Sequence, residues 1–171
     1  EGESDDWFFD SFLAFTTKAR SGNHFLNDIN LGTTMSGEGD FFAVPTPNPA
    51  KKSDWLELLD SELGEDGLWA RMDRVIEAHI QKLGPPEHKR NVVITIPYPQ
   101  ANQARFSDDP PKWNFSVINQ NLTAASEQRL AACKWFVDEV AARWEKLAPK
   151  HLHLLGFYWV YESLHYAWDV D

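Results

Sequence analysis

One carboxylate stands at the end of the most aromatic stretch of the chain. Residues 151–166 read HLHLLGFYWVYESLHY, and Glu162 follows Tyr158, Trp159 and Tyr161. Aromatic neighbours favour the protonated form of a carboxyl group, which suits a general acid. Aromatic faces also pack against the rings of sugars. The stretch therefore predicts a carbohydrate site in which Glu162 is the general acid or base.

Three further side chains are candidates for the same site. Tyr98 closes the run NVVITIPYP, and His165 follows Glu162 by three residues. Glycoside hydrolysis needs a second carboxyl group, roughly 5 Å away for retention or roughly 6.5–9.5 Å away for inversion of configuration. That partner is expected on a later strand, beyond this chain, and Asp10 is the one candidate for it within this chain. Asp10 as a strand-end hydrogen-bonding residue, and Glu162 as a salt-bridged strand-end residue, remain open as alternatives.

Composition and charge exclude several classes of function. The chain has 171 residues with 16 basic and 26 acidic side chains, a net charge of −10. Nucleic acids and anionic membranes require basic surface, so neither is an expected partner. The sequence has no apolar run long enough to cross a membrane. The histidine spacing shows no metal pattern, and neither a metal nor another cofactor is expected.

The order of apolar and amphipathic stretches predicts an α/β fold. Proline- and glycine-rich segments are expected to form long loops at about 18–50 and 100–122. Three apolar runs contain predicted strands: residues 7–15, residues 92–96 within the run 91–99, and residues 152–161. Helical patterns between them predict parallel strands joined by right-handed crossovers. Residues 1–171 are interpreted as a single domain, and Tyr98 and Glu162 are expected at the C-terminal ends of its strands.

The helices carry their own signals. Asp54, with Glu57 three residues later, is a predicted cap of a helix pair in residues 51–84. Thr123 or Ser126 is expected to cap the next helix. A stripe with steps of three and four residues predicts the buried face of that helix: Leu130, Cys133, Val137, Val140, Trp144 and Leu147.

The chain resembles the bacterial family filed as domain of unknown function 4855. The resemblance is carried by five segments spread over nearly the whole chain: DWFFDSFLAF, KSDWLELLD, NVVITIPYP, KWFVDEVAARW and LLGFYWVYES. It implies a (β/α)8 barrel of the TIM type, related to glycoside hydrolases, in a secreted or envelope-associated protein. The family's aromatic run ending in an acid maps onto Phe157, Tyr158, Trp159 and Glu162.

The length of the chain limits this interpretation. A full barrel has eight strands in about 250 residues, whereas three clear strands are visible here, so we expect roughly the first half of a barrel. Its open sheet would need another chain, a domain swap or a homo-oligomer to cover it. The expected function is a glycoside-hydrolase-like domain that acts on or binds a polysaccharide outside the cytoplasm. A non-catalytic glycan-binding domain, or a structural barrel piece inactive by itself, is the alternative.

Overall fold

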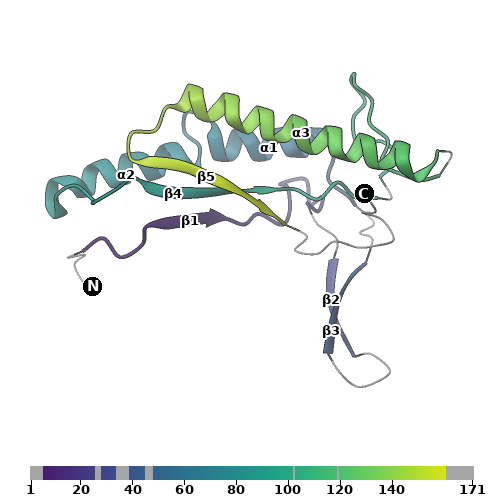
Figure 1. The fold of residues 1–171 in the computed structure, drawn as a ribbon, viewed down its shortest axis with the longest axis horizontal. Coiled ribbons are helices and arrows are strands. Elements are labelled where there is room, and N and C mark those ends of the chain that lie inside the picture. The colour runs from purple at the N-terminus through teal and green to yellow at the C-terminus, as the bar shows by residue number, and fades with distance from the viewer. Residues whose placement is uncertain are drawn as a thin grey trace.

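The computed structural model describes residues 6–25, 28–33, 39–44, 48–101, 103–118 and 120–160. Three helices and five strands follow one another in this part of the chain, and Figure 1 labels them. Their order is β1 (Ser11–Ala14), β2 (Asp28–Thr33), β3 (Gly39–Val44), α1 (Lys52–Leu63), α2 (Leu68–Leu83), β4 (Arg90–Ile96), α3 (Leu122–Leu147) and β5 (Leu152–Trp159).

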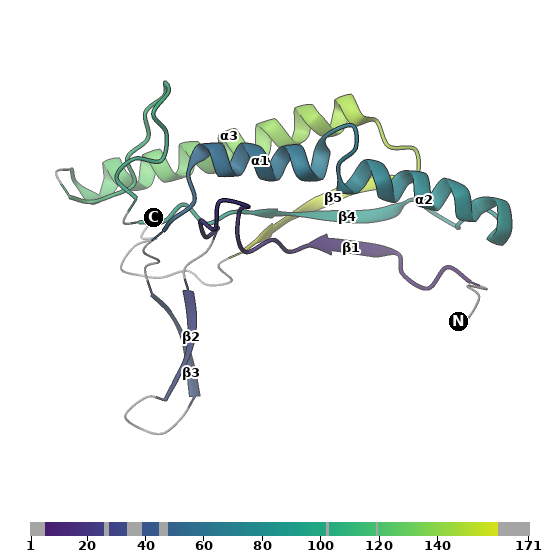
Figure 2. The ribbon, with the colours of Figure 1, turned by 180° about the vertical axis from the view of Figure 1, so that it is seen from behind.

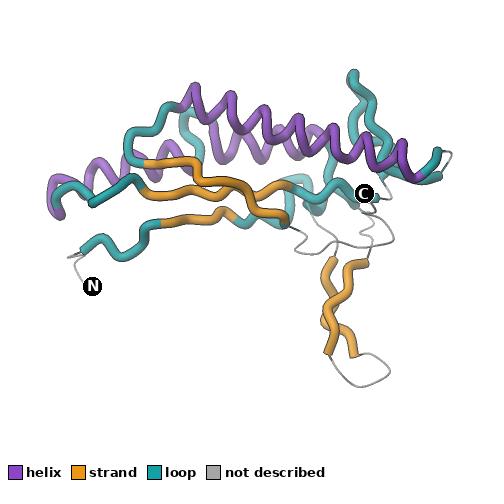
Figure 3. Tube along the Cα trace, in the orientation of Figure 1, coloured by secondary structure: helices purple, strands orange, loops and turns teal. Residues whose placement is uncertain are grey.

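The three predicted strands form one parallel sheet. β4 lies in the centre and pairs in parallel with β1 on one side and β5 on the other (Figure 3). A register shift interrupts the β4–β5 pairing between Val92 and Val93. The mixed α/β class and the parallel direction of the strands are therefore confirmed. β1 is shorter than the predicted strand at 7–15, because pairing with β4 is limited to Ser11–Ala14.

All three helices lie on the same side of this sheet (Figure 1). Alternate strand residues point into the layer between sheet and helices: Phe12, Ala14, Val92, Ile94, Leu152 and Leu154. Helix side chains such as Trp55, Ile76 and Phe136 fill the same core. Because strand side chains alternate in direction, the intervening residues face away from the helices. Leu13, Phe15 and Leu155 are accordingly exposed apolar residues.

The segment predicted as a loop at 18–50 contains regular structure. β2 and β3 pair antiparallel, with Asp28 opposite Val44 and Thr33 opposite Gly39. This hairpin projects away from the parallel sheet (Figure 1 and Figure 2). Gly and Pro mark turns, but the same residues flank short hairpin strands, so their density alone did not separate a hairpin from a loop.

The second long connection, between β4 and α3, is fixed to the helices by aromatic residues. Phe106, Trp113 and Phe115 are buried in the core. The Lys52 ammonium lies 5.4 Å from the centre of the Trp113 ring and 5.1 Å from that of Trp135, so it joins the loop to α1 and α3. A cation between two indole rings stabilises this arrangement.

The caps of α1 and α3 differ from the predicted ones. Lys51 is the N-cap residue of α1, and Asp54 occupies the third helical position, where its carboxylate accepts a hydrogen bond of 2.8 Å from the Lys51 backbone N–H. Ser21 and Asn23 donate to the same carboxylate at 2.9 Å. Asn121 caps α3 by accepting from the Ala124 N–H at 2.8 Å, in place of Thr123 or Ser126.

The predicted buried stripe of α3 is also displaced. The buried residues are Ala125, Arg129, Ala132, Phe136 and Val140, whereas Leu130 is 55% exposed. Of the predicted stripe, only Val140 belongs to this buried set. This buried face carries two small residues, Ala125 and Ala132, and one polar residue, Arg129, so a pattern of large apolar residues does not locate it. No helix in the described part of the chain is long and apolar enough to cross a membrane.

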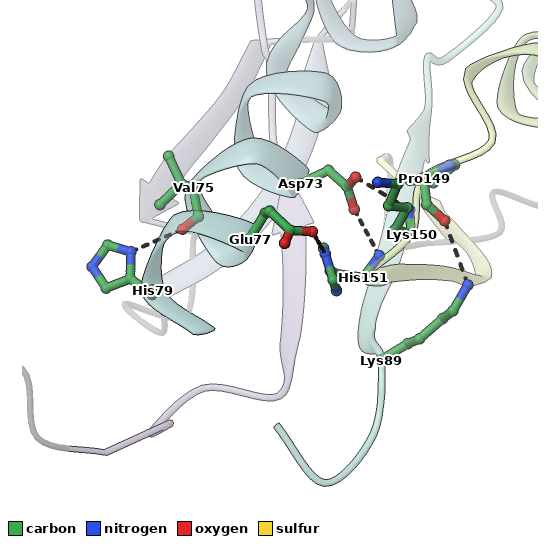
Figure 4. A network of polar contacts seen from close by, with 8 residues as sticks. All are labelled: Asp73, Val75, Glu77, His79, Lys89, Pro149, Lys150 and His151. Atoms are coloured by element: carbon green, nitrogen blue, oxygen red, sulfur yellow. Dashed lines mark hydrogen bonds and ion pairs between the residues drawn. The ribbon is translucent and has the colours of Figure 1, made fainter. Parts of the chain in front are cut away.

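Charged side chains of α2 bind the turn that leads from α3 into β5 (Figure 4). The Asp73 carboxylate accepts hydrogen bonds from the backbone N–H groups of Lys150 at 3.1 Å and His151 at 2.7 Å. Glu77 Oε2 lies 2.6 Å from His151 Nε2. These contacts lie where β5 begins, and they set the position of that strand against α2.

Candidate functional site

The strands β4 and β5 end side by side, which brings aromatic residues together. Ile96 and Trp159 are register partners, and the Tyr98 and Trp159 rings lie 5.7 Å apart at an interplanar angle of 72°. Val160 is buried in the same small cluster. We call this end of the sheet, comprising Phe15, Tyr98, Tyr158 and Trp159, the C-terminal rim. Parallel α/β folds place their ligand sites at this end of the sheet.

Tyr98 is an internal support of the rim. Its backbone N–H donates to the Phe25 carbonyl at 2.7 Å, and the side chain is 2% exposed. A ring buried to this degree has no face open to a sugar. Tyr98 was expected to stack on or hydrogen-bond a sugar, whereas in this structure its buried ring packs against Trp159.

A buried arginine on α3 binds Tyr98 and its neighbour. Arg129 Nε donates to the Pro99 carbonyl at 3.1 Å, and its terminal nitrogen donates to the Tyr98 hydroxyl at 3.3 Å. The guanidinium carbon also lies 5.5 Å from the centre of the Tyr98 ring. Planar, multiply donating guanidinium groups suit such buried sites. Arg129 was not predicted as a residue of this site. The sequence signal that could have found it is its position on the face of α3 that carries Ala125 and Ala132.

Phe15 and Tyr158 form the accessible aromatic pair of the rim. Their ring centres lie 5.8 Å apart, at an angle of 68°. Phe15 is 51% exposed and Tyr158 is half-buried. Thr95, the register partner of Tyr158, is buried and donates its hydroxyl to the Ala14 carbonyl at 2.6 Å. That bond joins β4 to the end of β1. It therefore helps to hold Phe15, which follows β1, beside Tyr158 of β5.

Asp10 lies at the other end of the sheet. It directly precedes β1, its carboxylate accepts from the Ser11 hydroxyl at 3.1 Å, and it lies 3.9 Å from His88 Nε2. Phe15, at the rim, is separated from it by the whole of β1. Asp10 is thus an exposed residue where a strand begins, and the interpretation that it faces a C-terminal site is corrected. The direction of β1 decides at which end Asp10 lies, and the residue type of Asp10 gives no information on that direction.

Three of the predicted residues lie outside the described part of the chain: Glu162, Tyr161 and His165. Trp159 and Tyr158 are the described members of the same stretch. The structure thus places the residues that lead up to Glu162 at the C-terminal rim.

A groove of about 630 Å³ lies elsewhere, among α1, α2 and the end of α3. Its lining includes Asp60, Asp73 and Arg143. Arg143 binds Asp60 and Glu139, and these hydrogen bonds raise its pKa against the lowering effect of partial burial. The Arg143 charge is therefore already paired within the protein. Within the described residues, no group of three or more His, Cys, Asp or Glu side chains is placed to hold a metal ion.

Comparison with known proteins gives one match. The model of the family described as "Domain of unknown function (DUF4855)" matches residues 1–171, the whole chain. No match was found among the curated proteins or among the solved structures.

Proposed function

The chain belongs to the family of the domain of unknown function DUF4855, and on this premise we propose that it binds a polysaccharide at the C-terminal rim. The observation that carries the proposal is the accessible pair Phe15 and Tyr158 beside Trp159. Exposed aromatic faces at the ends of parallel strands suit the C–H faces of sugar rings. Because the family resemblance implies a secreted or envelope-associated protein, the proposal includes an extracytoplasmic location.

We further propose that the sheet is part of a (β/α)8 barrel of the TIM type. Three parallel strands with helices on one side only have the arrangement of a barrel wall. The opposite face, with Leu13, Phe15 and Leu155 exposed, would then be the barrel interior. Additional strands of the barrel, or a second copy of the chain in a homo-oligomer, would cover this face.

Catalysis forms the finer part of the proposal. Glu162 follows Trp159 by three residues and would serve as general acid or base of glycoside hydrolysis, with Tyr161 and His165 lining the same mouth. The reaction needs a second carboxyl group within roughly 5–9.5 Å. Asp10, at the opposite end of β1, does not serve as that group.

A non-catalytic glycan-binding domain is the second candidate. The placement of Asp10 favours it, because this candidate for the second catalytic carboxylate lies away from the rim. Such a domain needs accessible rings and hydrogen-bonding groups but no pair of carboxylates.

Replacement of Glu162 by Gln separates the two candidates. If the chain is a hydrolase, Glu162→Gln should lower the release of reducing ends from a polysaccharide by about 10²- to 10⁴-fold. Binding of the same polysaccharide should change little, because the glutamine retains the shape of the side chain. Glu145→Gln, an exposed change on α3, is the matched control and should leave both measurements at the wild-type value.

The outcomes of this experiment are distinct. Unchanged turnover in Glu162→Gln would remove Glu162 from the mechanism. Binding without turnover in the wild-type protein would select the non-catalytic candidate, and absence of both across neutral and acidic polysaccharides would overturn the proposal.

A further inference from the structure

The face of the parallel sheet opposite the helices, which we call the open face, is depleted of charge. Its side chains alternate along the strands with those that enter the core. Within β1, β4 and β5, none of them is Asp, Glu, Lys or Arg, although 25% of all residues in the chain are. Such depletion is typical of the centre of a protein–protein interface. The residues of the open face include Ser11, Leu13, Asn91, Val93, His153 and Leu155.

One row of the open face is a line of hydrogen bonds across all three strands. Asn91 is the register partner of both Ser11 and His153. The Asn91 amide donates to the Ser11 hydroxyl at 3.4 Å, and Asn91 Oδ1 lies 3.2 Å from His153 Nδ1. A hydroxyl, a carboxamide and a neutral imidazole can each both donate and accept. The row can therefore form hydrogen bonds with an identical row.

The neighbouring positions are apolar and accessible. Leu13 is 47% exposed and Leu155 is 58% exposed. Phe8 and Phe9 precede β1, pack against each other at 4.9 Å and are 86% and 65% exposed. At roughly 150–250 Å² for an aromatic side chain, the two phenylalanines alone expose about 200–400 Å². With the leucines, this approaches the roughly 450–500 Å² of apolar area on each side of a standard interface.

The strand edges add a second requirement. Because β4 is central, β1 and β5 each have one edge without a partner among the described strands (Figure 3). The helices leave the open face uncovered (Figure 2). A two-fold axis along the strands would place two open faces together and bring β5 of each copy beside β1 of the other, in parallel. Such a closed arrangement leaves neither edge free.

We propose that a second copy of this chain covers the open face, with the two sheets face to face and all strands parallel. Residues of β4 then lie beside the axis and meet their own counterparts, which requires neutral side chains such as Asn91 and Val93. Because each copy has a net charge of −10, other surfaces of two copies repel each other. Both C-terminal rims lie at the same end of this dimer and stay accessible to a polysaccharide.

Sedimentation equilibrium of the whole chain tests the dimer. The wild type should be dimeric at about 50 μM, since interfaces of this size reach micromolar affinity or better. Leu13→Glu and Leu155→Glu each place two carboxylates close together, and each should weaken association about 100-fold or more. Leu130→Glu is the matched control, because Leu130 is 55% exposed on α3, and it should remain dimeric. Added salt should strengthen wild-type association by screening the repulsion.

Hydrogen exchange of the wild type covers the case in which a variant fails to fold. Amide exchange in β1 and β5 should slow as the protein concentration rises through the dissociation constant, while exchange in α2 should not change. A monomeric wild type, an assembly larger than a dimer, or dissociation by Leu130→Glu as well would overturn the dimer. So would a dimer that persists in both open-face variants. Dimer formation requires no polysaccharide, so a monomer that binds one would leave the proposed function intact.

Discussion

Where the strands of the parallel sheet begin, charged side chains bind backbone groups. Where the strands end, a buried guanidinium holds one aromatic ring, which packs against a second. At the beginning of β5, Asp73 and Glu77 of α2 hold the turn at Lys150 and His151 (Figure 4). At the C-terminal rim, Arg129 holds Tyr98, which packs against Trp159. Parallel α/β folds place their ligand sites at the second of these ends.

Individual hydrogen-bonding groups differ at the two ends, although each end has a buried donor without a partner: Arg90 Nε where β4 begins and Trp159 Nε1 where β5 ends. The Asp73 carboxylate has two backbone donors, one on each oxygen. The rim leaves Gln100 Nε2 and Trp159 Nε1 without acceptors. Unsatisfied buried groups lower stability. Variants at the two ends should consequently have different effects on stability and binding.

The largest expected effect belongs to Arg129. Arg129→Met should lower the free energy of unfolding by about 3 kcal/mol, because the Pro99 carbonyl and Tyr98 hydroxyl lose a charged donor inside the protein. Urea unfolding measures this value. The free energy of unfolding of Arg129→Lys should lie between those of Arg129→Met and the wild type, because an ammonium group cannot reproduce the planar pair of donors. Equal stability of Arg129→Met and the wild type would refute the supporting role of Arg129.

A pH-dependent effect is expected from Glu62, in the last turn of α1. Burial raises the pKa of Glu62 from 4.5 to about 7. Below the pKa of the unfolded state, Glu62 is protonated in both the folded and the unfolded protein, so its burial as a charge costs no stability. Stability is lost as the pH rises through the folded pKa, because the buried carboxyl must then ionise. A shift of this size corresponds to about 3 kcal/mol.

Glu62→Gln should remove this dependence. Relative to the wild type, its free energy of unfolding should rise by about 2–3 kcal/mol between pH 5 and pH 8. Chemical unfolding at the two pH values measures the difference, and Glu65→Gln, an exposed change nearby, serves as control. A constant difference across this pH range would show that Glu62 does not titrate in it.

The smallest effect is expected from Asp73. Asp73→Asn keeps one acceptor oxygen but loses the charge, so it should lower the free energy of unfolding by about 1–2 kcal/mol. Amide hydrogen exchange should accelerate at residues 150–153 and stay unchanged at Tyr98. Asp138→Asn, an exposed change on α3, should alter neither. Equal acceleration at both ends would contradict their independence.

The positions of helices and strands along the chain were easier to predict than which of their side chains face the core. Composition identified all three parallel strands, and the helix pair predicted in residues 51–84 is α1 and α2. Periodicity located α3 but assigned Leu130 to the core in place of Arg129. A long polar side chain reads as exposed in any pattern, and only its hydrogen bonds to Pro99 and Tyr98 allow its burial. Gln100, also polar and buried, was not predicted for the same reason.

By itself, the sequence determined which segments become strands and helices, because residue volume, branching and periodicity act over a few neighbouring positions. Only the tertiary structure decided that Asp10 lies where β1 begins, that Tyr98 turns beneath the rim, and that Phe15 meets Tyr158. These facts depend on strand order and register, which arise from pairing between segments about 80 and 60 residues apart. Local preferences contain no information on such distant partners.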